Sequence, residues 1–269
     1  MYDPHEVLRA LDAHRWAAIA VFGPAMALIA AWYTGAIRAS RRHRTFSIPL
    51  ACAAFYIAVD ASFISRYSTW FGRFHHWFLE LLWAYLLLTC TLGAYFIAQV
   101  MRYGHQETAA PLTPAQYRRG VLALVAGTCG LWACVRAQLQ DPLGLFSLHL
   151  SIVPYPVFGL AMTLRRRSRR GQTLTMWVCY TAGITLWSLG SLLFFGPGAR
   201  NWPWILLDSI AVLWALAATA IVHQAPDSVP CSGPGVGKRT NDDRRGGRPM
   251  NPDFSGPVRG SDPMRSDGG

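Results

Sequence analysis

The chain contains little charge and almost no lysine. Only 14% of its 269 residues are charged, and the single lysine, Lys238, lies near the C-terminus. A retinal Schiff base needs a lysine inside the membrane, so light-driven retinal chemistry is excluded. The one pair of adjacent acids, Asp242 and Asp243, also lies near the C-terminus. The aspartate-rich motif that binds a magnesium diphosphate in soluble enzymes is therefore absent.

Metal-ligating patterns are also absent. Five of the six cysteines lie in apolar stretches and Cys231 lies in the C-terminal segment, without the spacing of a disulfide framework or a zinc site. His75 and His76 have no partner at a ligand spacing. We therefore expect neither a metal nor another cofactor.

Apolar residues, in contrast, are abundant, at 52% of the chain with 11 Trp. A membrane-spanning helix needs about 20 mainly apolar residues. The qualifying stretches are continuously apolar, whereas barrel strands would alternate. The sequence thus predicts an all-α polytopic membrane protein, a seven-transmembrane-helix bundle. The seven stretches are 15–37, 46–66, 75–101, 119–139, 144–164, 173–195 and 202–223.

Arginines predict the orientation. The loops after the first, third and fifth stretches hold twelve arginines, against six on the other side. Short cytoplasmic loops collect basic residues, so the N-terminus is expected outside and the C-terminus inside, with the chain in the cytoplasmic membrane. The net charge of +11 then arises from the basic cytoplasmic loops and a basic tail, and it is explained by attraction to anionic lipid headgroups. We therefore expect the bilayer as a partner and no nucleic acid.

The pattern predicts three regions. Residues 1–14 form an N-terminal extracytoplasmic segment without a cleavable signal, and residues 15–223 form the membrane domain. Residues 224–269 are rich in Gly, Pro, Asp and Arg without a hydrophobic period, which is typical of a disordered cytoplasmic tail.

Three acids inside apolar stretches are the leading candidates for chemistry. Asp60 lies six residues before Arg66, Glu80 five after His75 and Asp208 six after Trp202. With the predicted orientation, each lies roughly 8–9 Å inside the outer edge of its helix. Ionisable groups within a membrane helix are costly and usually functional. One shared pocket is therefore expected, although each acid could instead be a buried carboxyl bonded to a neighbouring helix.

Aromatic residues flank each acid at the spacing of three or four that brings side chains together on a helix. Their faces attract cations, so they suit a reaction that passes through a carbocation. The alternative is a role in packing or in the membrane-interface belt. These residues are Tyr56 and Phe63 beside Asp60, Trp77 and Trp83 beside Glu80, and Trp204 before Asp208.

Several segments together resemble a family of small seven-helix integral-membrane terpene cyclases of fungal meroterpenoid and indole-diterpene pathways, which has bacterial relatives in drimentine-type indole sesquiterpenoid pathways. The resemblance covers about residues 46–215. The matching segments are Pro49–Asp60 (PLACAAFYIAVD), Trp77–Glu80 with Tyr103–Glu107 (YGHQE), Ser151 with Arg165–Arg170 and Gly171–Thr173 (GQT), and Asp208.

The resemblance implies a lipophilic prenylated aromatic or indole substrate, a functional link to a prenyltransferase and an epoxidase, and rings formed without a metal. It also implies that Ser151 helps to bind the substrate. Asp60 stands where fungal members commonly have glutamate, and Tyr180 and Thr181 stand where they tend to have lysine. These departures leave open whether a terminal alkene or an epoxide is protonated.

The expected mechanism needs one neutral carboxylic acid as proton donor. Burial in a dry pocket favours the neutral form of a carboxyl. Asp60 is the leading donor, Asp208 assists it or takes a proton back, and Glu80 orients. The rival class is a small proton-coupled carrier of the sugar and amino-acid type. It is suggested by Pro24 in the first stretch and by Pro154 with Pro156 in the fifth, which indicate a parallel repeat. A non-catalytic membrane scaffold is a third interpretation.

Overall fold

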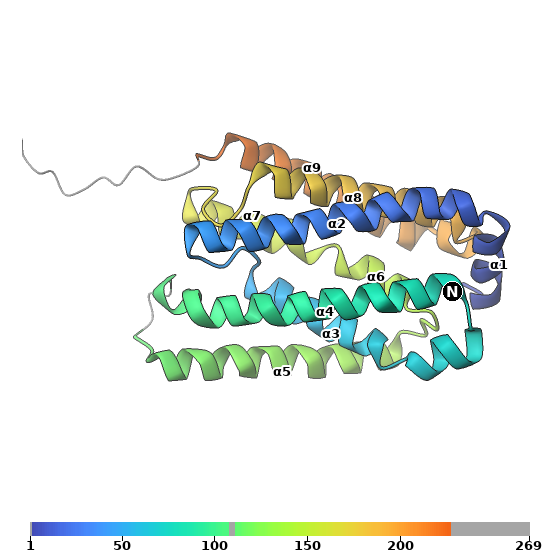
Figure 1. Ribbon diagram of the computed structural model, residues 1–269, viewed down its shortest axis with the longest axis horizontal. Coiled ribbons are helices and arrows are strands. Elements are labelled where there is room, and N and C mark those ends of the chain that lie inside the picture. The colour runs from blue at the N-terminus through green and yellow to red at the C-terminus, as the bar shows by residue number, and fades with distance from the viewer. Residues whose placement is uncertain (1, 108–110, 227–269) are drawn as a thin grey trace, which may run out of the picture. The chain divides into compact units, whose positions relative to one another are not determined.

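The computed structural model describes residues 2–107 and 111–226, and these residues form helices and no strand (Figure 1). Seven helical segments are long and apolar enough to cross a membrane, which confirms the predicted all-α, multi-pass fold. Most of the predicted tail, from residue 227 on, lies outside the described residues. The helices are α1 Pro4–Ala13, α2 Arg15–His43, α3 Leu50–Ile64, η1 Ser68–Phe74, α4 Trp77–Tyr103, η2 Gly104–Glu107, α5 Pro114–Gln138, α6 Leu145–Ser151, α7 Pro154–Arg166, α8 Leu174–Phe194, η3 Pro197–Arg200 and α9 Trp202–Gln224.

The N-terminal segment contains an amphipathic helix that the sequence analysis did not predict. Asp3 caps α1 by accepting the backbone N–H of His5, and Val7, Leu8 and Leu11 are buried. Helix α1 lies across the ends of α2 and α8 (Figure 1). This end of the bundle is therefore covered by an ordered helix.

Tyr2 connects the N-terminal segment to the start of α6. Its hydroxyl donates to Asp141 and accepts the backbone N–H of Leu143 at 3.1 Å. Burial, together with the charge of Asp141, raises the pKa of Tyr2 well above its usual value, so the hydroxyl stays a donor. The other oxygen of Asp141 accepts the N–H of Ser147 at 2.7 Å and thereby caps the first turn of α6.

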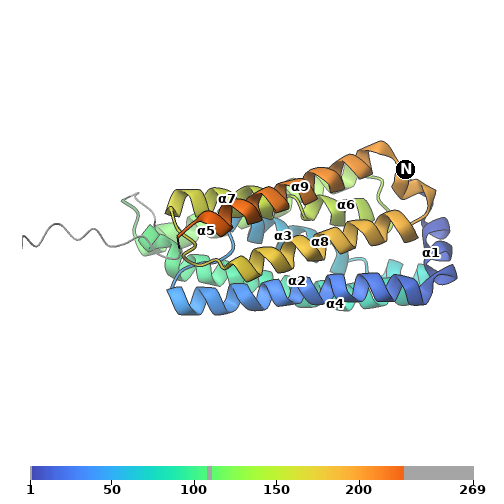
Figure 2. The ribbon, with the colours of Figure 1, turned by 90° about the horizontal axis from the view of Figure 1, so that it is seen from above.

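Helices α2, α8 and α9 pack next to one another, as Figure 2 shows. Glycines on α8 allow close approach, because a Cβ at Gly183 would lie 2.9 Å from Ile29 and one at Gly190 would lie 2.8 Å from Phe22. Helix α3 packs against α4, α5, α6 and α7. Helices α2 and α4 meet mainly through side chains, and the Tyr85 hydroxyl donates to the Met26 carbonyl across this seam.

The fifth membrane segment is broken near its middle into α6 and α7. Pro154 and Pro156 lack the N–H groups that would bond to the carbonyls of Leu150 and Ile152 in a continuous helix. The hydroxyl of Tyr180 on α8 donates to the Ile152 carbonyl instead. Non-helical backbone at membrane depth is tolerated where other protein groups satisfy it.

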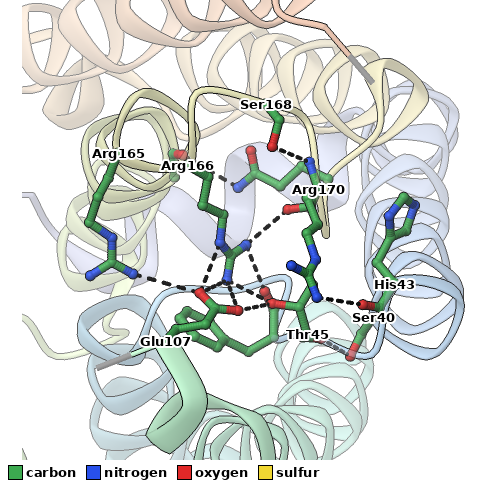
Figure 3. A network of polar contacts seen from close by, with 11 residues as sticks. Ser40, His43, Thr45, Glu107, Arg165, Arg166, Ser168 and Arg170 are labelled. Atoms are coloured by element: carbon green, nitrogen blue, oxygen red, sulfur yellow. Dashed lines mark hydrogen bonds and ion pairs between the residues drawn. The ribbon is translucent and has the colours of Figure 1, made fainter. Parts of the chain in front are cut away.

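The Arg166 side chain bonds to three connecting segments at the end of the bundle opposite α1: those between α2 and α3, between α4 and α5, and between α7 and α8 (Figure 3). Its Nη2 donates to both carboxylate oxygens of Glu107, to Oε2 at 2.7 Å and to Oε1 at 3.0 Å. Its Nη1 donates to the backbone carbonyls of Phe46 and Arg170. The Arg166 side chain is 9% exposed, whereas neighbouring Arg165 is 63% exposed and lies 3.9 Å from the same carboxylate. Arg166 is therefore the structural cation of this cluster.

Replacement of the two neighbouring arginines is expected to have unequal effects on stability. Arg166→Gln removes the bidentate partner of the Glu107 carboxylate, which keeps the Thr45 hydroxyl as a donor, and removes the donor of two loop carbonyls, at a cost of about 1–3 kcal/mol. The apparent melting temperature in detergent should fall by about 2–4 °C for each kcal/mol. Arg165→Gln is the matched control and should melt close to the unmodified protein; equal losses in the two variants would contradict this role of Arg166.

Candidate functional site: a buried acid in an aromatic cavity

A cavity of about 100 Å³ lies among α2, α3, α4, α8 and the break between α6 and α7. Its wall is mainly apolar and strongly aromatic. The aromatic lining residues are Trp32, Tyr33, Tyr56, Tyr85, Tyr180 and Trp187, and the polar non-aromatic ones are Asp60, Thr89 and Ser151.

Asp60 is the one acid among the residues that line this cavity. It is 6% exposed, and the hydroxyl of Thr89 on α4 donates to its Oδ2 at 2.7 Å. The same hydroxyl lies 3.1 Å from the carbonyl of Leu86. A hydroxyl both donates and accepts, so Thr89 can serve either form of the Asp60 carboxyl.

The aromatic wall is held by ring contacts among three helices. The Trp32 ring lies 4.5 Å from Tyr33 and 5.0 Å from Tyr180, measured between ring centroids. Tyr155, behind the wall, stacks on Trp177 and lies 4.7 Å from Trp32. Such a wall holds aromatic rings in a fixed arrangement around the cavity, which suits an apolar ligand that becomes cationic.

Asp208 is buried but does not line the cavity. Its Oδ1 lies 2.6 Å from Nδ1 of His149, which is fully buried on α6. The Nε2 of the same imidazole lies 3.2 Å from the Trp187 indole nitrogen and 2.9 Å from the Ser191 hydroxyl. Asp208 is thus connected to the cavity wall through His149 and Trp187.

Glu80 lies at a third place. Its carboxylate is 3.1 Å from Nδ1 of His75, its side chain is 35% exposed, and it does not line the cavity. The expectation that all three acids share one pocket is therefore wrong. Counting along a helix gives the depth of a residue in the membrane. Two residues at the same depth are in contact only if their side chains also point toward each other from their helix axes.

The predicted binding residues divide in a similar way. Tyr56 and Ser151 line the cavity. The other four lie elsewhere: Phe63 stacks on Trp70, Trp77 donates to Asp12, Trp83 donates to the Ile64 carbonyl, and the Trp204 ring lies 4.8 Å from that of His149.

Sequence reasoning missed the hydrogen-bond partners of both buried acids, Thr89 and His149. A signal existed for His149, because it is a lone ionisable residue within the apolar run 145–150. Thr89 carried no such signal, since threonines are common in membrane helices. Within residues 2–107 and 111–226, no three His, Cys, Asp or Glu side chains converge as metal ligands would.

Comparison with known proteins adds no relative. No family model matches this chain, and no curated protein or solved structure matches it.

Removal of the Thr89 hydroxyl should destabilise the protein more than removal of a similar hydroxyl nearby. Thr89→Val keeps the side-chain shape but deprives the buried carboxyl of Asp60 of a hydrogen bond, at a cost of about 1–3 kcal/mol. Thr91→Val is the matched control, because the exposed Thr91 hydroxyl bonds only to the Leu87 carbonyl of its own helix. The measurement is the apparent melting temperature of each variant in detergent. If Thr89→Val and Thr91→Val have the same apparent melting temperature, the hydrogen bond between Thr89 and Asp60 does not contribute to stability.

Proposed function

We propose that this protein is a membrane-embedded terpene cyclase. It protonates the terminal alkene, or the epoxide, of a prenylated aromatic or indole substrate and folds the isoprenoid chain into fused rings. The observation that supports this most is a single buried acid, Asp60, in a cavity lined by aromatic rings. The resemblance of residues 46–215 to membrane terpene cyclases points to the same chemistry.

The first step is a proton transfer from Asp60. The neutral carboxyl gives its proton to the CH carbon of the terminal alkene, the π electrons form the new C–H bond, and a tertiary cation remains at the dimethyl-substituted carbon. With an epoxide, the proton goes to oxygen and a C–O bond breaks. Before transfer, the Asp60 O–H can donate to Thr89 while Thr89 donates to Leu86; afterwards the Thr89 hydroxyl turns to the carboxylate.

The cavity wall supports the cation after this step. Ring faces stabilise a nearby cation by about 0.5–2 kcal/mol each, and more when water is excluded. A dry, shaped cavity also protects the cation from capture by water and holds the chain folded for ring closure. Transfer of one proton from the final cation to the Asp60 carboxylate restores the acid and makes the product an isomer of the substrate.

The substrate reaches the cavity from the bilayer in this proposal. Ligand pockets usually measure about 300–1,000 Å³, so the cavity of about 100 Å³ must open to hold an isoprenoid chain. The seam between α2 and α4 is suited to this, because side chains rather than close backbone packing hold it. A prenyltransferase would make the substrate, and an epoxidase would act before the cyclase if the epoxide is used.

The membrane orientation belongs to the same proposal. Twelve arginines in the loops after the first, third and fifth membrane segments favour a cytoplasmic position for those loops, with the N-terminus outside the cytoplasmic membrane. The Arg166 cluster would then lie at the cytoplasmic face, where the exposed side chain of Arg165 would meet anionic headgroups.

Replacement of Asp60 should strongly slow deuterium uptake from heavy water. Membranes that contain the protein are incubated in heavy water with farnesylated indole and with epoxyfarnesyl phenol. The unmodified protein should convert the alkene to an isomer with one deuterium on the former CH carbon of the terminal alkene. Asp60→Asn should lower this rate by about 10²–10⁴-fold, because the amide cannot donate an acidic proton. Glu80→Gln, at an acid outside the cavity, is the matched variant and should retain turnover.

Other outcomes would change the conclusion. Cyclisation of the epoxide alone would assign the epoxide-opening branch. If the folded protein converts neither substrate, and sealed vesicles instead accumulate an unchanged solute against a proton gradient, the protein is a carrier.

A further inference from the structure

The orientation of His149 follows from its neighbours. An indole N–H can only donate, so the contact of 3.2 Å between Trp187 Nε1 and His149 Nε2 assigns Nε2 as an acceptor. The Ser191 hydroxyl, 2.9 Å from the same Nε2 and 2.9 Å from the Trp187 carbonyl, is compatible with this assignment because it can donate to either group. The imidazole hydrogen is then on Nδ1, which donates to Asp208 Oδ1 at 2.6 Å. The assignment makes one directed chain, from Trp187 through His149 to Asp208.

The two ends of this chain differ in their access to the cavity. Trp187 lines the cavity, whereas neither His149 nor Asp208 does. All three side chains are buried, and the His149 ring is enclosed between Trp204 at 4.8 Å and Trp187 at 6.1 Å, measured between ring centroids. The chain therefore connects α9 and α6 to one ring in the cavity wall on α8.

Proton transfer along this chain is disfavoured by its direction. The group nearest the cavity is the indole N–H, which is a donor without acid–base function in water. A proton from the cavity would have to replace that indole hydrogen bond at Nε2 in order to reach Asp208. Asp208 is therefore poorly placed to supply or accept the proton of a reaction in this cavity.

We infer that Asp208 is a positioning residue that acts through His149 to hold the indole of Trp187 in the cavity wall. This inference rests on the proposed cyclase function where it concerns products. It replaces the expectation that Asp208 shares the proton chemistry of Asp60. The held ring keeps its face toward the folded isoprenoid chain, so it determines how far ring closure proceeds, while Asp60 alone starts the reaction.

Two variants of Asp208 separate positioning from proton transfer. Asp208→Asn retains an oxygen that accepts from His149 Nδ1, so turnover should stay within about threefold of the unmodified protein. Asp208→Leu removes the acceptor; deuterium uptake should continue, but the fraction of partly cyclised product should rise about tenfold or more, as it should in Trp187→Phe. Loss of deuterium uptake in folded Asp208→Asn, comparable with that in Asp60→Asn, would overturn the inference.

A spectroscopic measurement tests the chain without substrate. The ¹H–¹⁵N indole signal of Trp187, assigned from its disappearance in Trp187→Phe, should be shifted by its hydrogen bond and protected from exchange with deuterium. Asp208→Asn should preserve this protection, and Asp208→Leu should reduce it at least tenfold. Unchanged protection in Asp208→Leu would overturn the positioning role, whereas a protected signal without turnover of any substrate would contradict only the proposed function.

Discussion

The structure depends on one constraint, that the backbone groups of a membrane bundle and the charges buried in it need partners within the protein. Six of the seven membrane segments satisfy their backbone mainly by helical hydrogen bonds. The fifth cannot, because Pro154 and Pro156 interrupt it, and side-chain hydroxyls compensate at the break: Ser151 donates to Leu148 and Tyr180 to Ile152. The cavity lies at this break. The interruption thus creates irregular backbone and shaped space at the same place, which is how non-helical segments are used in many membrane proteins.

The same constraint divides the buried charged groups into different roles. Arg166 and Glu107 satisfy each other in a bidentate pair and join three connections of the bundle. Asp208 is engaged by a short contact to His149, away from the cavity. Asp60 has only a threonine hydroxyl, which can donate or accept, and it faces the open volume. A buried charged group that is paired with an oppositely charged or strongly donating side chain contributes to structure. Asp60 is bonded instead to a hydroxyl that can donate or accept, so its carboxyl can gain or lose a proton without losing its partner.

Packing density also differs around the cavity in a way that fits a lipophilic ligand. Glycines on α8 bring α2 and α8 close together, and aromatic rings fill the space behind the wall. The seam between α2 and α4 lacks such close packing and is bridged by Tyr85. A wall that is rigid on one side and opened by side-chain movement on the other can admit a flexible chain from lipid and still impose one folded shape on it.

The seven membrane segments follow from the sequence alone, because long apolar runs have one stable form in hydrocarbon, and buried acids are rare enough there to be noticed. The sequence also placed Asp60, Tyr56 and Ser151 among the candidates, and all three line the cavity. It could not show that Glu80 points to His75 or that Asp208 meets His149. Depth in a membrane is a count along one helix, but a site requires a particular rotation of several helices at once. That rotation is decided by packing between segments far apart in the chain, and so by the tertiary structure.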